Sequence, residues 1–328
     1  MPAATPATHV LVLRGAELVA DPPEPLESLR GRSGEVLWVD VPNPSHATMA
    51  DLARIFTLHP LAVEDALKRR QRPKAEEYDH LLFITTHAAR ARGGHGHSVA
   101  LDEIDLFYGR DFIITAHAGG CPALDDARRR VEQAPADLRR SEGYVLYAIL
   151  DAVVDSYFPV LDSLDDYVER LEDTLFKTPT PQTMDRLFAS KRALLQLRRV
   201  AAPQRDMMNI LLRHDGILVS APLRAYFRDI YDHLLRITEQ IDTHRDLLAG
   251  ALDIYLSIVS NRLNEVMKVL TVITATFASL AVISGIYGMN FQRSYPPFDW
   301  QYGFVTAVGI MAASVAVMLI IFRRLRWL

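Results

Sequence analysis

The residues best suited to interact with ions lie along one face of a long helical segment near the C-terminus. Small or polar residues recur every three or four positions, at Asp253, Ser257, Ser260, Asn264, Met267, Thr271, Thr274, Ala278, Ala281, Gly285 and Gly288. An apolar seam with the mean spacing of coiled coils, near 3.5 residues, runs beside this polar stripe from Leu252 to Leu280. This combination suits a ring of identical helices around a water-filled axis.

Ordinary packing between membrane helices is the alternative explanation of the polar stripe, because Gly, Ala, Ser and Thr are enriched at such contacts. The stripe, however, continues beyond the apolar segment to Asn264, Ser260 and Asp253. A dry contact between two helices gains nothing from a carboxylate at its end. We therefore favour a pore-lining face, in which Asp253 repeated around a ring forms an acidic collar that concentrates cations.

The polar stripe runs into a segment that is long and apolar enough to span a membrane. The first 18 residues of 269–290 carry no charge, and a second uncharged run follows at 302–322 after a short loop. Basic residues flank the two runs on one side, at Arg262, Lys268, Arg323, Arg324 and Arg326. Because basic flanks stay in the cytoplasm, we expect a hairpin of two transmembrane helices with both termini cytoplasmic.

Composition excludes several other classes of protein. Charged residues make up 23% of the 328 residues and the formal net charge is −4, which is not the balance of a nucleic-acid binder. The single cysteine, Cys121, excludes a disulfide framework and a cysteine-based zinc site. The N-terminus does not have the pattern of a signal peptide. The sequence contains no phosphate-binding glycine loop, HExxH motif or nucleophile motif, so neither nucleotide binding nor enzymatic activity is expected.

The rest of the chain should divide into an α/β part and a helical part. We predict strands at 9–14, 36–41, 79–87, 101–108 and 112–115, and short helices that begin at Ser45 and at His59-Pro60. Helices are predicted over 143–175, 181–214 and 222–287, with Pro159 kinking the first or lying near a bend. The last helix would be about 100 Å long, so most of it must project from the membrane as a stalk.

The chain resembles the CorA family of divalent-cation channels, which includes the zinc-linked ZntB branch. The most specific signature is Tyr287-Gly288-Met289-Asn290, at the outer end of the first predicted span. The stretches 59–65, 71–74, 226–233 and 264–271 also agree. The resemblance implies an α/β cytoplasmic domain, a long-helix stalk and two C-terminal transmembrane helices in a funnel-shaped homopentamer with an axial pore.

The chain is accordingly expected to have six parts. These are a cytoplasmic α/β domain (1–142), an acidic helical region (143–221), a stalk that continues as the pore-lining span (222–290), an extracytoplasmic loop (291–301), a second span (302–322) and a basic cytoplasmic tail (323–328).

On this resemblance, the four residues from Tyr287 to Asn290 form the selectivity filter. A ring of amide and carbonyl oxygens can hydrogen-bond the water shell that Mg²⁺ gives up reluctantly, and it binds weakly enough for release. A helix C-cap also explains Gly288 followed by Asn290, and both interpretations can hold together. The loop 291–299 lacks the acidic segment common in magnesium-specialised members and has only Asp299 as an anion, which leaves the preferred metal open.

Other positions on the polar stripe have predicted roles in conduction. Met267 and Leu270 could form a hydrophobic constriction that gates by dewetting, although coiled-coil packing explains Leu270 as well. Thr271 and Thr274 could offer oxygens to a passing hydrated ion, or could instead bond back to their own helix. The predicted pore lining is completed by Asn264, Ala278, Ala281 and Gly285, and the two alanines suggest a wider or less polar middle section.

The resemblance also implies a regulatory metal site in the cytoplasmic part. Asp65 and Asp229 match positions at which the family binds divalent metal between neighbouring subunits, and Glu64 and Asp151 are candidates for a second site. By residue type alone, Asp229 is an unremarkable exposed carboxylate. Eight carboxylates in 151–173 form mostly a solvated face that attracts cations. His95 and His97 lie in a glycine-rich loop, where loop polarity is a simpler explanation than metal binding.

Three functions remain open. The first is a channel in the inner (plasma) membrane for passive, potential-driven uptake of Mg²⁺, Co²⁺ or Ni²⁺, gated by cytosolic Mg²⁺. The second keeps the fold but transports Zn²⁺ or another transition metal, with or without proton coupling. The third is a membrane-anchored coiled-coil sensor or scaffold. The unbroken polar stripe favours the first two.

Overall fold

The computed structural model describes residues 8–14, 17–92, 98–135, 138, 141–177, 180–213, 223–289 and 300–327. The chain forms two compact units, residues 1–251 and 252–328. The boundary between these units falls inside one long helix, α9 (Arg224–Tyr287). The six-part division expected from the sequence follows composition and stays a prediction.

The first unit is built on a seven-stranded sheet with the order β2-β1-β3-β7-β6-β5-β4. The strands are β1 His9–Arg14, β2 Glu17–Ala20, β3 Glu35–Pro42, β4 Lys74–Tyr78, β5 Leu81–Arg92, β6 Ser98–Tyr108 and β7 Phe112–His117. Neighbouring strands are antiparallel except β3 and β7, which pair in parallel. The β3 strand has six consecutive buried residues, because it lies inside the sheet and is covered on both faces.

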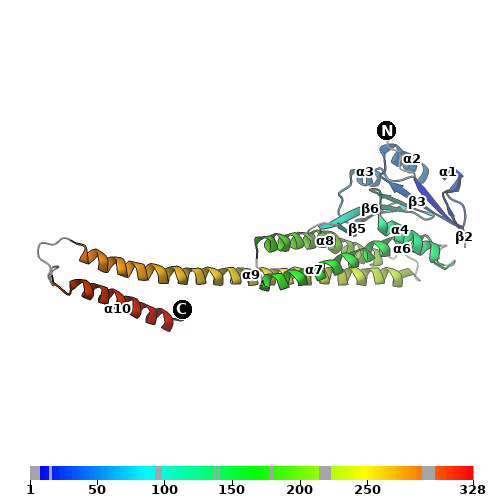
Figure 1. Ribbon diagram of the computed structural model, residues 1–328. Coiled ribbons are helices and arrows are strands. Elements are labelled where there is room, and N and C mark those ends of the chain that lie inside the picture. Colours follow the sequence, from blue (N-terminus) through cyan, green and yellow to red (C-terminus); the bar gives the residue numbers. More distant parts are fainter. Residues whose placement is uncertain are drawn as a thin grey trace. The chain divides into compact units, whose positions relative to one another are not determined.

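One face of the sheet is covered by α2 (His46–Phe56) and α3 (Pro60–Lys68), which follow the short helix α1 (Leu26–Leu29) in the chain (Figure 1). Ser45 caps α2 as predicted, since its hydroxyl accepts a hydrogen bond from the Thr48 amide at 3.0 Å. The apolar core under these helices includes Val39, Met49, Phe56, Phe83, Phe107 and Ile114.

The opposite face carries α6 (Glu142–Asp155), α7 (Tyr157–Lys177) and α8 (Pro181–Arg213), with α4 (Pro122–Gln133) packed beside α6 (Figure 1). The predicted helix over 143–175 breaks at Ser156, and Pro159 lies in the first turn of α7, where a missing N–H costs little. Gln204 joins α8 to β5 and to α7. Its side-chain oxygen accepts from the His87 amide of β5 at 2.7 Å, and its nitrogen donates to the Tyr157 hydroxyl of α7 at 2.9 Å.

The helix α9 has 64 residues, which corresponds to about 96 Å. Its N-terminal part belongs to the first unit, where it buries an apolar stripe that includes Phe227, Ile230, Leu234, Ile237 and Ile241. In the second unit its C-terminal part is followed by α10 (Gly303–Arg324). The predicted helices over 222–287 and 302–322 are therefore confirmed as helices.

Three helical segments among the described residues are long and apolar enough to cross a membrane, judged by length and composition alone: Glu142–Leu175, Arg224–Tyr287 and Gly303–Arg324. Burial separates them. The apolar window of the first is 72% buried inside the protein, whereas the windows of the second and third are 0% and 6% buried. The first segment therefore owes its apolar residues to the core around the sheet.

Five strands and two short helices were predicted near their observed positions, but β2, β4, α1 and α4 were not. The β4 strand reads KAEEY, and its lysine and glutamates conceal a strand that lies at the edge of the sheet, where one side stays in water. The helix α4 carries the charged run DDARRR, and its few buried residues, Ala123, Leu124, Ala127 and Val131, are mostly small.

Candidate functional site

Three metal-ligating side chains converge in the first unit: Asp151 on α6, and Asp229 and His233 on α9. Each offers one ligand atom, and these atoms lie within 4.8 Å of one another. Asp229 and His233 are one helical turn apart and therefore share a face of α9. We call these three residues the metal cluster. The structure thus brings together Asp151 and Asp229, which were predicted as metal positions.

His233 was not predicted, although its spacing from Asp229 is a usable signal. Residues four apart on a helix are neighbours, and a carboxylate followed by a histidine at that distance can offer two ligands to one ion. Asp151 is far away in the sequence, so the sequence does not show that it completes the group.

The metal cluster carries more negative than positive charge. A further carboxylate, Asp155, lies beside it, with Oδ1 at 3.6 Å from His233 Nδ1, and His233 Nε2 is 3.8 Å from Asp229 Oδ2. Arg130 on α4 forms ion pairs with Asp151 and, at 2.7 Å, with Asp155. Burial and the nearby Asp155 charge raise the pKa of Asp151, while Arg130 and His233 oppose that rise. The three carboxylates Asp151, Asp155 and Asp229 and the one guanidinium leave two negative charges among these four side chains.

Aromatic side chains hold the ligands of the metal cluster in place. The Tyr147 side chain hydrogen-bonds to Asp151, and its ring lies against Tyr226 at a centroid distance of 5.0 Å. Phe158 packs edge-on against the His233 ring at 5.6 Å. These contacts join α6, α7 and α9 around the cluster, so a change in the position of α9 would also move the ligands.

The residues present fit a divalent cation. Mg²⁺ prefers oxygen ligands, which Asp151, Asp155 and Asp229 supply, and imidazole also suits Co²⁺, Ni²⁺ and Zn²⁺. The His233 Nδ1 atom is buried and has no hydrogen-bond partner among the described residues. The left-over negative charge and this nitrogen, which lies 3.6 Å from the Asp155 carboxylate without a hydrogen bond, are both what a bound cation would satisfy.

The predicted regulatory residues Asp65 and Glu64 are on α3, and each is paired within its own chain. Lys74 Nζ lies 2.6 Å from Asp65 Oδ2, Gln71 donates to Asp65 Oδ1 at 3.3 Å, and Glu64 pairs with Lys68. The predicted pairing of Asp65 with Asp229 joins two different subunits. It therefore stays a prediction, as does the contribution of Glu64 to a second site.

In the second unit, the polar stripe faces away from the helix that packs against α9. Positions that are half-buried on α9 include Val272, Thr276, Ser279 and Ile283, and the Ser279 hydroxyl lies 3.8 Å from Met318 Sδ of α10. Two residues correspond to about 200° around a helix, so Thr274, Ala278, Ala281 and Gly285 lie on the opposite side. Every predicted pore-lining residue is exposed in the single chain: Asp253, Asn264, Met267, Leu270, Thr271, Thr274, Ala278, Ala281 and Gly285.

The structure describes the chain at the C-terminal end of α9 up to Met289. The helix ends at Tyr287, where the Gly288 amide donates to the Ser284 carbonyl at 2.9 Å and the Met289 amide donates to Ile286 at 3.3 Å. This turn agrees with the helix-end interpretation of Gly288. Asn290 lies outside the described residues, as do the loop 291–299 and the histidines at 95 and 97, so the filter stays a prediction. Thr271 bonds back to the Met267 carbonyl at 2.7 Å, which favours the structural alternative for its hydroxyl.

Comparison with known proteins decides the family. The sequence profile of the CorA-like Mg²⁺ transporter protein family matches residues 33–324. This chain belongs to the CorA family. The cobalt/magnesium transport protein CorA of Thermotoga maritima is 32% identical over 293 residues, which cover 89% of this chain and 83% of that protein. YfjQ of Bacillus subtilis is 35% identical over 290 residues, covering 88% of this chain and 89% of that protein.

A solved structure shows the same fold over nearly all of this chain. The CorA magnesium transporter from Methanocaldococcus jannaschii superposes with a TM-score of 0.84, covers 97% of this chain and 98% of its own, and is 23% identical. The family profile and the relatives above 30% identity confirm the resemblance inferred from the Tyr287–Asn290 signature. Because CorA proteins are transporters, the prediction that this chain is not an enzyme is confirmed as well.

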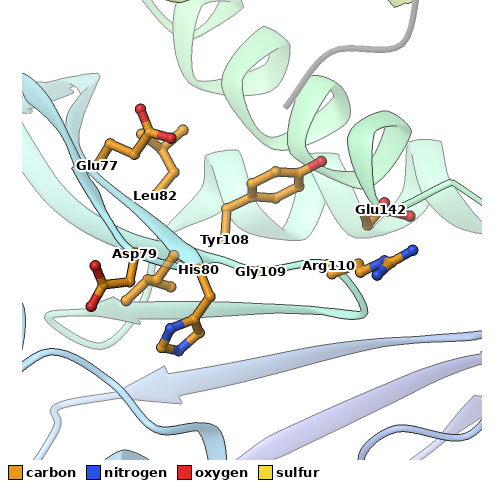
Figure 2. Close-up of a pocket in the computed structure, with 9 residues that line it drawn as sticks. Glu77, Asp79, His80, Leu82, Tyr108, Gly109, Arg110 and Glu142 are labelled. Carbon is orange, nitrogen blue, oxygen red and sulfur yellow. The ribbon is translucent and has the colours of Figure 1, made fainter. Parts of the chain in front are cut away.

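A cavity of about 460 Å³ in the first unit lies apart from the metal cluster of this CorA protein and contains none of the predicted site residues. Figure 2 shows Glu77 and Asp79 on one side of it, Arg110 and Glu142 on the other, and the Tyr108 ring between them. Burial raises the pKa of Glu142. The charged side chains that line this cavity include both acidic and basic groups and are mostly exposed, so we assign no ligand to the cavity.

The metal cluster can be tested by thermal unfolding of the full-length protein across a Mg²⁺ series. Asp151→Asn combined with Asp229→Asn should remove the Mg²⁺-dependent rise in melting temperature. A site that binds only the folded state would stabilise the parent by about 2.7 kcal/mol at a free concentration one hundred times the dissociation constant. The matched control, Asp162→Asn with Asp232→Asn, removes two exposed carboxylates from α7 and α9. Equal Mg²⁺ responses in all three proteins would refute the cluster.

Proposed function

We propose that this CorA protein is a membrane channel for passive, potential-driven uptake of divalent cations. Mg²⁺ is the principal ion, and Co²⁺ and Ni²⁺ are further candidates. The observation that carries this proposal is the unbroken stripe of small and polar residues on α9, which lies opposite the face that packs on α10. Family membership supports the same conclusion, and it leaves the sensor or scaffold hypothesis without a basis.

The pore is formed by five copies of the C-terminal part of α9, with α10 on the lipid side. Both helices cross the inner (plasma) membrane, and both termini stay in the cytoplasm because the basic residues lie at those ends. The remaining apolar segment, Glu142–Leu175, is excluded as a transmembrane span because its apolar window is mostly buried in the first unit. The apolar seam beside the stripe includes Ile273 and Phe277, which are exposed in the single chain and supply contacts between neighbouring copies.

The transport needs no nucleotide, because the membrane potential drives it. Moving two charges inward gains about 4.6 kcal/mol per 100 mV. At the outer end of α9, a ring of Gly288 carbonyls and Asn290 amides selects the ion by hydrogen bonds to its water shell. Such a ring binds the ion weakly, which lets it pass into the pore.

Cytosolic metal closes the channel. A divalent ion bridges Asp65 of one subunit to Asp229 of the next, with Asp151 and His233 close to the same position. Two carboxylates that face each other across an interface repel unless a cation lies between them, so the closed ring depends on metal. A ligand shifts a conformational equilibrium only if its affinities for the two states differ, and a bridging site that exists only in the closed ring supplies that difference. The constriction controlled in this way is at Met267 and Leu270.

A second candidate function is transport of Zn²⁺ or another transition metal. The observation in its favour is His233, because a nitrogen ligand beside carboxylates suits those ions better than it suits Mg²⁺. His233 lies in the metal cluster and not on the polar stripe, so it bears on regulation more directly than on the transported ion.

The filter is tested by measuring metal uptake into proteoliposomes. Asn290→Ala should abolish selective Mg²⁺ and Co²⁺ uptake while the oligomer stays intact, since the amide ring that orients hydrated ions is lost. Asn261→Ala is the matched control, because it removes the same side chain from an exposed position on α9 outside the polar stripe. Uptake by Asn290→Ala at the rate of the parent would show that the filter is assigned wrongly.

The pore-lining face is tested by a pair of adjacent substitutions. Ala278→Asp places a ring of carboxylates along the water-filled axis, so an assembled and conducting channel is expected. Phe277→Asp places the same charge on the apolar seam, so loss of assembly is expected, measured by size-exclusion chromatography. The reverse result, with Phe277→Asp assembled and Ala278→Asp not, would contradict the assignment of the two faces.

A further inference from the structure

Arg130 on α4 pairs with two carboxylates at the metal cluster, Asp151 and Asp155. Its guanidinium contacts Asp151 through Nη1 and lies 2.7 Å from Asp155 through Nη2, so it joins two carboxylates on successive turns of α6. The Asp151 side chain is only 9% exposed, whereas that of Arg130 is 36% exposed. A buried carboxylate without a partner is costly, and Arg130 is the positive group that removes this cost in the metal-free chain.

The charges around Arg130 also determine what a metal ion meets. Without Arg130, the three carboxylates Asp151, Asp155 and Asp229 would repel one another inside a partly buried group. With Arg130 present, two negative charges remain, which is the charge that one divalent cation neutralises. The guanidinium contacts an oxygen of Asp151 that would otherwise be free to bind metal, so it competes with the ion directly.

We propose that Arg130 is a tethered counterion, which holds Asp151 and Asp155 in position when the metal cluster is empty and lowers the affinity of the cluster for divalent cations. The proposal rests on the proposed function, since the regulatory role of the metal cluster is assigned there. The consequence is regulatory. The cluster binds metal only when the cytosolic metal concentration is high, and its carboxylates keep their positions when the metal dissociates.

The same arrangement recurs at the other predicted ligand. Asp65 is held at 2.6 Å by Lys74, which also lies 2.8 Å from Glu76. Asp65 and Asp151 are thus each paired with a basic side chain of their own chain, Lys74 and Arg130 respectively. Arg130 is the clearer case, because Asp151 is the more deeply buried carboxylate.

The experiment combines Mg²⁺ binding by calorimetry with thermal unfolding of the full-length protein. Arg130→Gln should bind Mg²⁺ about tenfold more tightly, since one positive charge near the ion is removed. The same variant should melt lower than the parent without Mg²⁺, and this gap should close as Mg²⁺ is added. Arg130→Lys keeps the charge and should retain an affinity near that of the parent.

The control is Arg129→Gln, which removes an exposed arginine next in the chain that pairs only with Asp126 among the described residues. It should leave both the affinity and the Mg²⁺ response unchanged. If Arg130→Gln lowers the melting temperature equally with and without Mg²⁺ and leaves the affinity unchanged, Arg130 is only structural and the proposal is wrong. If the parent itself shows no Mg²⁺ response, the cluster does not bind Mg²⁺ and the role proposed for Arg130 is refuted as well. This outcome differs from the previous one, in which the cluster binds Mg²⁺ and only the role of Arg130 is refuted.

Discussion

The cost of removing a divalent cation from water is the constraint on which the account of this protein depends. An ion of two charges cannot enter hydrocarbon, so any route across the membrane must supply oxygen atoms or water along its whole length. The helix α9 satisfies this requirement by carrying a stripe of small and polar residues through an otherwise apolar segment. Because α10 packs on the opposite face, the stripe is left free to line the proposed pore.

The same helix links the proposed pore to the proposed sensor. Asp229 and His233 of the metal cluster and the constriction residues Met267 and Leu270 all belong to α9, which has no break between them. The cluster also contains Asp151 from α6, which pairs with Arg130 from α4. Occupation by a metal would therefore change the balance of charge between α9 and the helices that cover the sheet, and a continuous helix can transmit that change along its length.

The sequence predicted the elements whose signals are local. The capping serine at Ser45, the uncharged runs and the long helical periodicity each reflect interactions between residues near one another in the chain. It did not predict the edge strand β4 or the helix α4, where charged residues conceal the few positions that pack. The contact of Arg130 with Asp151 was also missed, because these residues are on different helices and only the fold brings them together. The pairing of Asp65 with Asp229 requires a second subunit, so it rests on family resemblance.

The most direct test of the account measures Mg²⁺ flux into proteoliposomes under an imposed inside-negative potential, with and without Mg²⁺ on the cytoplasmic side. The parent should conduct without any nucleotide, in proportion to the potential, and should close when cytoplasmic Mg²⁺ is high. The double variant Asp65→Asn with Asp229→Asn should keep conducting under the same closing condition. Mg²⁺ flux that does not depend on the membrane potential would contradict the account. Closure of the double variant at the same cytoplasmic Mg²⁺ concentration as the parent would contradict it as well.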